Sequence, residues 1–209
     1  MTISPRILDK LIHSVNETIE QASDEVAELD RAIGDGDHVI NLQRGLAILV
    51  EQSDDISQLE WVAAWQKIGM ICMSKIGGAS GSLFGTLFVS MAKSAKDKPF
   101  DSSVFAAAFL AGVESMKARG KTEAGEKTML DVLIPVAEYL QNNAQSDLAT
   151  VLAEVQLIAT QSMESTRDML ATKGRASFLE ERSIGHIDAG AKSCQLMICA
   201  IAATLQSLD

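Results

Sequence analysis

Apolar residues recur at steps of three and four positions along most of the chain, the spacing that places them on one face of an α-helix. The first such segment runs from about residue 4 to residue 22. The same spacing predicts seven further helices, over about residues 37–51, 58–75, a stretch after Ile76 up to 95, 102–119, 128–142, 147–172 and 188–205. Nowhere does an alternating pattern of useful length predict a strand. We therefore expect an all-α fold, one domain over residues 1–209 built from about eight antiparallel helices.

The predicted connections differ in character. Residues 23–36 are a short segment that leads into an aspartate-rich loop, and residues 53–57 are a polar break. The connection over residues 173–193 is long, polar and punctuated by glycines. Because long connections without structure of their own are usually functional or disordered, this last one is a candidate part of a site.

Composition supports packed helices and narrows the function classes. Hydrophobic residues make up 47% of the chain and aromatic residues only 4%, with three prolines. No apolar run reaches the ~18 residues of a membrane span, and the first residues do not resemble a signal peptide. The three scattered cysteines, in apolar helical patterns, are expected to be reduced core thiols, which favours a cytoplasmic protein. A net charge of −10 argues against a nucleic-acid groove, which needs clustered lysine and arginine.

The most distinctive chemistry lies in the loop LDRAIGDGDH. Asp30, Asp35 and Asp37 fall within eight positions, and Gly34 and Gly36 let the backbone fold them toward one point. Carboxylates this close repel one another unless a cation or protons lie among them, and hard oxygen ligands without cysteine favour Mg²⁺. The alternative is an ordinary turn, with Asp37 capping the next helix and no metal.

Two predicted helix starts add possible anion ligands. His38, Asn41 and Arg44 lie on or near the first turn of the helix after the aspartates, where free N–H groups point outward, although each is equally typical of a solvated helix surface. The stretch IGGASGSLFGT places Ala79 and Ser80 at a second, glycine-rich helix start. Its glycines allow close backbone approach to an anion, or tight packing between helices.

Four blocks together resemble a known family. They are LDRAIGDGDH, IGGASGSLFGT, RGKTEAGEKTMLD and KGRASFLEERSIGHIDAGA, in that order along the chain. This combination resembles the nucleotide-binding L subunit of dihydroxyacetone kinase over essentially the full length. The resemblance implies an eight-helix antiparallel barrel that holds ADP or ATP and two Mg²⁺ ions at one end.

The resemblance also assigns roles to residues. It implies that Asp30, Asp35 and Asp37 ligate the magnesium ions. The nucleotide-binding positions that it implies are His38, Asn41, Ala79, Ser80, Gly120, Thr128, Met129, Arg175, Asp188, Ala189 and Gly190. Two positions depart from the usual pattern, since Val39 replaces a glycine and Ala189 a proline. Val39 raises the question of how closely the backbone meets the phosphate.

The implied activity is phosphoryl transfer, which needs positioning and charge neutralisation and no obligatory protein nucleophile. The family's dihydroxyacetone is held covalently on a separate K-type subunit, so a partner chain is expected. Phosphate reaches the nucleotide either from a phosphohistidine protein of the phosphotransferase system, with ADP as a bound coenzyme, or from free ATP, as in kinases of related sugars. The first source is favoured here. A module that binds nucleotide and docks on a transcriptional regulator is the rival hypothesis.

Overall fold

The computed structural model of the chain describes residues 4–208, and every regular element among these residues is a helix. The first half contains α1 (Ile7–Gln21), α2 (Ser23–Ile33), α3 (His38–Glu51), α4 (Ser53–Ser57), α5 (Trp61–Lys75) and α6 (Gly78–Ala95). The second half contains α7 (Ser102–Gly120), α8 (Leu130–Asn142), α9 (Leu148–Ser165), the 3-10 helices η1 (Thr166–Asp168) and η2 (Arg175–Ser183), and α10 (Ala189–Gln206). The all-α prediction is confirmed.

The eight predicted helices correspond to α1, α3 and α5 to α10, and the structure corrects several boundaries. The segment before the aspartates is the helix α2, which buries Val26 and Ile33, and the polar break at residues 53–57 is the short helix α4. The predicted helix over residues 147–172 ends at Ser165, because Met169 adopts an extended conformation after η1. Part of the long polar connection is also helical, as η2.

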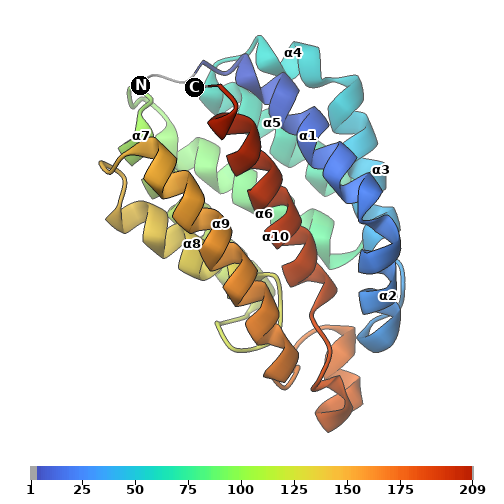
Figure 1. Ribbon diagram of the computed structural model, residues 1–209. Helices are drawn as coiled ribbons and strands as arrows, with labels where there is room; N and C mark the ends of the chain where they lie inside the picture. Colours follow the sequence, from blue (N-terminus) through green and yellow to red (C-terminus); the bar gives the residue numbers. More distant parts are fainter. Residues whose placement is uncertain (1–3, 209) are drawn as a thin grey trace.

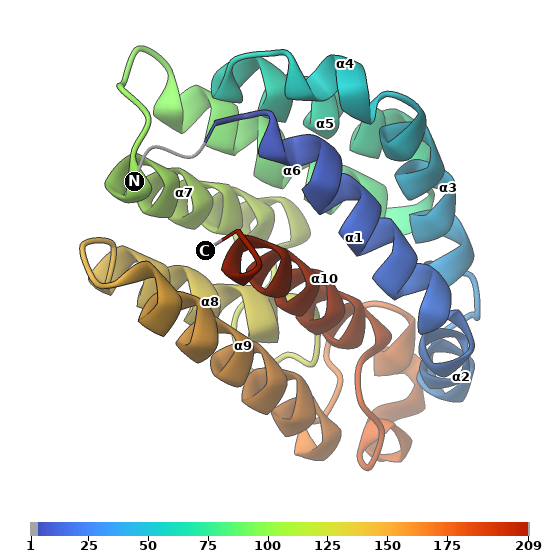
Figure 2. The same ribbon diagram turned by 45° about the horizontal axis from the view of Figure 1, so that its top comes forward.

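The eight long helices form a closed ring. Each packs on its neighbours in the order α1, α3, α5, α6, α7, α8, α9 and α10, and α10 packs on α1 to close it. Figure 2 shows this ring, in which neighbouring helices run in opposite directions. Buried apolar side chains from all eight helices form one continuous core, so each helix is held by burial against two neighbours.

Close approach between α5 and α6 depends on glycine. A Cβ atom at Gly85 would lie 2.9 Å from the carbonyl oxygen of Gly69 and 2.1 Å from the Cγ atom of Met73. Real Cβ atoms do not approach other atoms this closely, so the two helices can touch only because neither glycine carries a side chain. The small residues of the IGGASGSLFGT stretch therefore do serve tight packing, one of the two roles its sequence allows.

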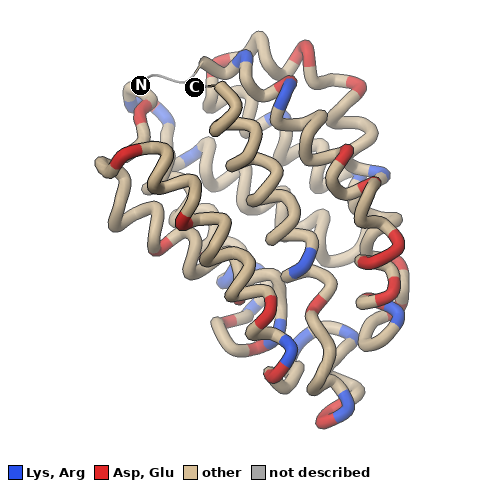
Figure 3. The backbone as a smooth tube through the Cα atoms, in the orientation of Figure 1, with Lys and Arg blue, Asp and Glu red and all other residues tan. Residues whose placement is uncertain are grey.

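The alternating direction of the helices divides the connections between two ends of the barrel. The links α2–α3, α5–α6, α7–α8 and α9–α10 lie at one end, and the start of α1 and the end of α10 lie at the other (Figure 1). Lysine, arginine, aspartate and glutamate gather around the α9–α10 connection (Figure 3). Polar chemistry is therefore concentrated at the first end.

A cavity of about 680 Å³ lies inside the barrel, toward the end opposite the polar one. Its lining is almost entirely apolar and includes the aromatic group Trp61, Trp65, Phe100 and Phe105. Its two carboxylates, Asp101 and Asp147, accept hydrogen bonds from the backbone at the starts of α7 and α9. Both are therefore engaged as helix caps.

The cysteines match the expectation of core thiols. Cys72, Cys194 and Cys199 are free, and the first two are buried. Burial raises the pKa of the Cys72 thiol to about 12, so this thiol is protonated and unreactive at neutral pH. Among the described residues, no helix combines the length and the hydrophobicity needed to cross a membrane.

Candidate functional site

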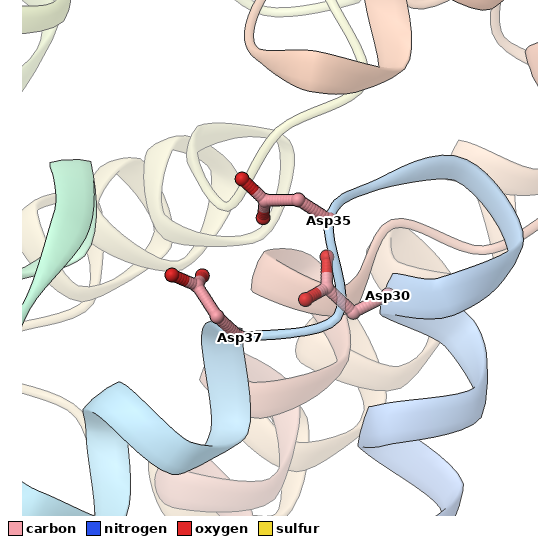
Figure 4. Close-up of side chains that lie close together, drawn as sticks. All are labelled: Asp30, Asp35 and Asp37. Carbon is pink, nitrogen blue, oxygen red and sulfur yellow. The ribbon is translucent and has the colours of Figure 1, made fainter.

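The three aspartates lie together at the link between α2 and α3. One carboxylate oxygen from each of Asp30, Asp35 and Asp37 lies within 4.8 Å of the others. Figure 4 shows the three side chains around a common space, Asp30 from the end of α2 and the other two from the loop. The sequence predicted this proximity, and the geometry has the hard oxygen donors that suit Mg²⁺.

Glycine makes this arrangement possible. A Cβ atom at Gly34 would lie 1.9 Å from the Oδ1 atom of Asp30, so only glycine lets that carboxylate lie over the loop. Gly36 has a φ of 77°, in the left-handed region that L-residues avoid. The loop conformation therefore depends on both glycines of the GDGD sequence.

The competing explanation for Asp37, that it caps the following helix, does not hold. Asp37 precedes α3, but its side chain makes no capping hydrogen bond. Instead Asp30 accepts a hydrogen bond of 2.9 Å from the backbone N–H of His38. Helix capping therefore does not account for the Asp37 carboxylate, which faces the carboxylates of Asp30 and Asp35 (Figure 4).

His38 joins three helices beneath the aspartates. Its Nδ1 atom lies 3.2 Å from the Oγ atom of Ser80 on α6, and its Nε2 atom lies 2.9 Å from the Oγ atom of Ser193 on α10. Ser193 donates its own proton to the carbonyl of Gly190, so we assign Nε2 as the protonated nitrogen and Ser80 as the donor to Nδ1. Burial lowers the pKa of His38, against the opposing charges of Asp30 and Asp37. The ring is therefore a neutral linker between helix starts.

Asn41 and the start of α6 form one wall. The Asn41 side chain is buried and packs so closely on Gly77 that a Cβ atom there would lie 2.2 Å from its Oδ1 atom. Gly78 begins α6 with a φ of 66°, and Ala79 and Ser80 follow in its first turn. The N–H groups of this turn are free of intrahelical partners.

The α7–α8 connection forms the opposite wall. Asp131, in the first turn of α8, accepts hydrogen bonds of 2.5 Å from the N–H of Gly125 and 2.6 Å from that of Thr128. These bonds fold the connection back on itself and present Thr128 and Met129 to the interior of the site. Gly120, at the end of α7, lies beside them.

Asp188 is the half-buried N-cap of α10, and its pKa is raised. Its carboxylate accepts a hydrogen bond of 2.7 Å from the N–H of Ala191. Burial raises the pKa of Asp188 to about 7, an effect that the nearby Asp131 increases and that the hydrogen bond from Ala191 opposes. Two residues after Asp188, a Cβ atom at Gly190 would lie 3.4 Å from Met129, so the two residues are in close contact.

Residues 166–188, here termed the α9–α10 segment, cover the site from one side. Arg175 in this segment forms an ion pair of 3.0 Å with Asp35, between two substantially exposed side chains. Exposed pairs contribute little to stability, so this contact places Arg175 near the aspartates without locking it there.

These walls enclose one cavity of about 730 Å³ at the polar end of the barrel. Every residue of the metal set and of the nucleotide set that the family resemblance implies lines it: Asp30, Asp35, Asp37, His38, Asn41, Ala79, Ser80, Gly120, Thr128, Met129, Arg175, Asp188, Ala189 and Gly190. Arg44, the further anion-ligand candidate, is not part of the lining and donates a hydrogen bond of 3.2 Å to the Oδ1 atom of Asn41. The residues come from all four connections at this end. Their convergence is what a site built between helix starts requires.

The sequence analysis missed Lys127 and Ser193. Lys127 lines the cavity, yet its side chain is only 1% exposed, and Ser193 holds the His38 ring. Burial lowers the pKa of the Lys127 ammonium, while Asp188, Asp168 and Asp131 oppose the change. Lysine in a polar loop is ordinary in a sequence, so nothing in the local pattern distinguishes this one.

The two departures from the family pattern are accommodated. Val39 is 4% exposed and its side chain belongs to the hydrophobic core, so it points away from the cavity. Ala189 is the first residue of α10, where alanine and proline are both compatible with the helix because no intrahelical N–H bond is lost. Val39 is therefore not part of the cavity lining, while Ala189 is.

The donor set fits a nucleotide and magnesium. Three clustered carboxylates offer hard oxygens, and the helices α3, α6, α8 and α10 all begin at the cavity. Helix N-termini carry free N–H groups and a partial positive charge, which favour phosphate. The cavity thus pairs a cation site with several anion-binding helix ends.

Comparison with known proteins identifies the family. The DAK2 domain model matches residues 32–203. The chain is 40% identical over 193 residues to the ADP-binding subunit DhaL of the PEP-dependent dihydroxyacetone kinase 1 from Listeria innocua, covering 92% of this chain and 93% of that protein. It is 39% identical to the corresponding DhaL subunit from Escherichia coli over 183 residues, 86% of this chain and 87% of that one.

A solved structure shows the same fold. The dihydroxyacetone kinase from C. freundii, determined in complex with AMP-PNP and Mg²⁺, superposes with a TM-score of 0.76 at 21% identity. The match covers 94% of this chain and 33% of that chain, so the chain spans about a third of the larger kinase. The all-α barrel is therefore shared with it, and together with the matching domain model and the full-length relatives this shows that the chain belongs to the DAK2 domain family of dihydroxyacetone kinase subunits.

Proposed function

We propose that this chain is the ADP-binding phosphotransfer subunit of a dihydroxyacetone kinase. The observation that carries the proposal is the cavity in which three carboxylates and the starts of four helices converge. The names of its full-length relatives, which are ADP-binding subunits of PEP-dependent kinases, agree with that chemistry. A cytoplasmic location is part of the proposal and fits the free core thiols.

In this proposal Asp30, Asp35 and Asp37 hold two Mg²⁺ ions, which neutralise charge on the nucleotide phosphates when bound. The first turns of α3 and α6 supply backbone N–H groups, with Asn41 and Ser80 adding side-chain donors. The neutral His38 ring fixes these two turns relative to α10, so the donors are set before the nucleotide arrives.

We place adenine and ribose between the α7–α8 connection and the start of α10. Met129 offers an apolar side chain in the cavity wall, and Gly190 packs closely against it from the start of α10. Arg175 lies at the rim within reach of a terminal phosphate or of the metal ligands. Phosphoryl transfer needs positioning and charge neutralisation and no obligatory protein nucleophile, so in this proposal the chain positions the reactants.

The phosphoryl acceptor is proposed to be dihydroxyacetone held on a K-type subunit, and the donor a phosphohistidine protein that regenerates ATP from bound ADP. The PEP-dependent and PTS-dependent relatives support this donor. A second candidate is an ATP-dependent kinase of a related ketose. It is favoured by 32% identity to a D-erythrulose kinase from Mycolicibacterium smegmatis, of which the chain spans 34%.

The test separates the two phosphate sources. The purified chain is loaded with Mg·ADP, washed free of excess nucleotide, and mixed with a K-type subunit, dihydroxyacetone and a phosphohistidine donor. Formation of dihydroxyacetone phosphate without free ATP supports the proposal. Turnover only when free ATP is supplied supports the second candidate instead.

The matched control is Asp37→Asn, which removes one metal-ligand charge at a residue that makes no capping bond. We expect it to lose Mg·ADP loading and product formation while folding normally. Wild-type chain that binds neither Mg·ADP nor Mg·ATP would contradict both candidates.

A further inference from the structure

One buried cation at the polar end is unexplained by the proposed function. Lys127 lies in the α7–α8 connection, directly before Thr128 and Met129 of the cavity wall. Its side chain is 1% exposed, and its backbone has a φ of 61°, in the left-handed region. A buried ammonium in a strained conformation costs free energy unless its partners compensate, so its contacts are informative.

The Lys127 ammonium is fully engaged by backbone carbonyls. Its Nζ atom donates to the carbonyl oxygens of Thr166 and His186, and lies 3.5 Å from that of Arg167. An ammonium has three N–H donors, and three carbonyls face it. No donor is left for a phosphate, so Lys127 does not act as a nucleotide ligand even though it borders the cavity.

These carbonyls lie at both ends of one segment. Thr166 and Arg167 begin the α9–α10 segment and His186 is near its end, while Arg175 and Phe178 of the cavity rim lie between. The two ends also bond to each other, because the N–H of Gly185 donates to the carbonyl of Arg167 at 2.8 Å. The segment therefore leaves and returns at a single point, and Lys127 is the charge at that point.

Two neighbouring contacts reinforce the same junction. The hydroxyl oxygen of the buried Thr166 accepts a hydrogen bond of 3.1 Å from the N–H of Asp188. Glu126, the residue before Lys127, accepts from the hydroxyl of Thr172 and forms an ion pair of 3.5 Å with Lys173. The α7–α8 connection thus contacts the α9–α10 segment at both of its ends, through Lys127, and also at Thr172 and Lys173, through Glu126.

Electrostatics favours a cation at this position. The carbonyls of residues 166 and 167 follow the end of α9, where the helix dipole is negative. Asp188, Asp168 and Asp131 add carboxylate charge around the ammonium, while the Arg167 guanidinium opposes their effect. The carbonyls of Thr166 and Arg167 also accept from the N–H groups of Met169 and Gly185. A neutral side chain of the same size would therefore remove the charged donor that these carbonyls share with that of His186, at a cost in free energy.

We propose that Lys127 is the positioning residue that anchors the α9–α10 segment over the nucleotide cavity and thereby sets how long bound ADP is retained. The inference rests on the proposed function, because it assigns that cavity to ADP. It adds that Lys127 fixes the base of the segment, so that Arg175 and the cavity rim stay over the nucleotide. Without the anchor both ends of the segment loosen together.

The test compares Lys127→Met with the parent chain. Methionine keeps the length and apolar stem of lysine and removes the ammonium. The first measurement is the release rate of Mg·ADP after a chase with excess nucleotide, and the second is hydrogen exchange of the amides of residues 169–185 in the nucleotide-free chain. We expect release about tenfold faster, the effect of losing one hydrogen bond to a charged group, and faster exchange confined to this segment.

Two further variants make the result specific. Thr166→Val removes the hydroxyl at the same junction in an isosteric side chain, and we expect a smaller change in the same direction. Lys93→Met, at an exposed position near the end of α6, should behave as the parent. A purely structural lysine would lower the urea midpoint of the whole chain and leave ADP release unchanged where both proteins are folded.

The outcomes separate the two proposals. Unchanged release and unchanged segment exchange in Lys127→Met overturn the anchoring inference. If Lys127→Met does not fold, Thr166→Val decides, and parent-like release and exchange in that variant overturn it. A parent chain that binds no Mg·ADP contradicts the proposed function instead, while segment exchange still tests the anchor.

Discussion

Single residues show how neighbouring positions in this sequence are divided between core and site. Val39 and Ile40 follow the cavity residue His38, but Val39 is buried in the core and Ile40 is 56% exposed. Adjacent residues on a helix point about 100° apart, so a departure from a family pattern at one position need not reach the ligand. The question raised by Val39 is answered by the direction of its side chain.

Val39→Gly should therefore lower stability and leave nucleotide retention unchanged. Losing a buried valine and adding glycine to a helix costs about 2–4 kcal/mol in the free energy of unfolding. Urea unfolding and the release rate of Mg·ADP measure the two effects. Ile40→Ala, at the adjacent exposed position, is the control and should cost less than about 1 kcal/mol. Tighter ADP retention in Val39→Gly would show that the valine does disturb the phosphate site.

The half-buried Asp188 predicts a pH dependence of stability without metal or nucleotide. Its folded pKa of about 7 is above the ordinary value of 3.8. Between these values the folded chain keeps a proton that the unfolded chain has lost, so this residue makes stability fall as pH rises from about 4 to about 7. Its contribution is constant below and above that window.

Asp188→Asn isolates this effect, because its side-chain oxygen can still accept from the N–H of Ala191. We expect the urea midpoint of the parent, relative to that of the variant, to decrease between about pH 4 and about pH 7. The comparison is needed because His38, whose pKa is lowered by burial, gives the opposite slope as protonation of its ring sets in. A difference that stays constant across this range would contradict the raised pKa.

Among the elements, the start of α6 combines tight packing with ligand binding. A Cβ atom at Gly81 would lie 2.1 Å from the carbonyl oxygen of Ile76 and 3.0 Å from that of Cys72. Both are backbone atoms, which cannot rotate away as a side chain can. The position of Ser80 and of the free N–H groups therefore depends on how closely α6 meets the end of α5.

Gly81→Ala should displace this helix start. We expect a loss of about 1–3 kcal/mol in the free energy of unfolding from overpacking. We also expect weaker binding of Mg·ADP, because the first turn of α6 moves. Titration calorimetry and urea unfolding test both, with Lys93→Ala on the exposed face of the same helix as the control. Unaltered ADP affinity in a destabilised Gly81→Ala would separate packing from binding at this helix.

For the whole molecule, we expect one bound ligand to stabilise the entire fold, because the long helices form a closed ring. The four connections at the polar end join α2 and seven of the eight long helices, all except α1, so a ligand in the cavity contacts links from most of the ring. A ligand that binds only the folded chain stabilises it by mass action. Mg·ADP should therefore raise the melting temperature of the protein as a unit.

At about one hundred times its dissociation constant, Mg·ADP should add about 2.7 kcal/mol and raise the melting temperature by about 5–10 °C. Scanning calorimetry with and without Mg·ADP measures the shift. In Asp37→Asn the shift should largely disappear, while the melting temperature without ligand stays equal or rises slightly, since one of three clustered carboxylates is neutralised. A full shift in Asp37→Asn would remove this residue from the proposed metal site.

The sequence by itself predicted the eight long helices and the all-α class, which the structure confirms, and it indicated the residues of the proposed site. Helical periodicity depends on neighbours a few positions apart, so the eight long helices were predictable. Only boundaries set by tertiary packing were wrong: α2 and α4 are short, and the end of α9 is fixed by the turn at Thr166 to Met169. The residues of the proposed site were selected because glycine and aspartate clusters mark the links between helices and their four blocks resemble one family. The structure brings these residues to one cavity, and their binding roles stay a prediction.

The tertiary structure alone decided which of these residues meet and what each side chain does. Closure of the ring joins α1 to α10 and brings links far apart in sequence to one end, which no local pattern encodes. Only that arrangement shows Asp37 without a capping role, His38 between two serines, and Val39 in the core. Lys127 is the clearest case, because its carbonyl partners lie 39 or more positions away along the chain. Its burial distinguishes this lysine from others, whereas its sequence context does not.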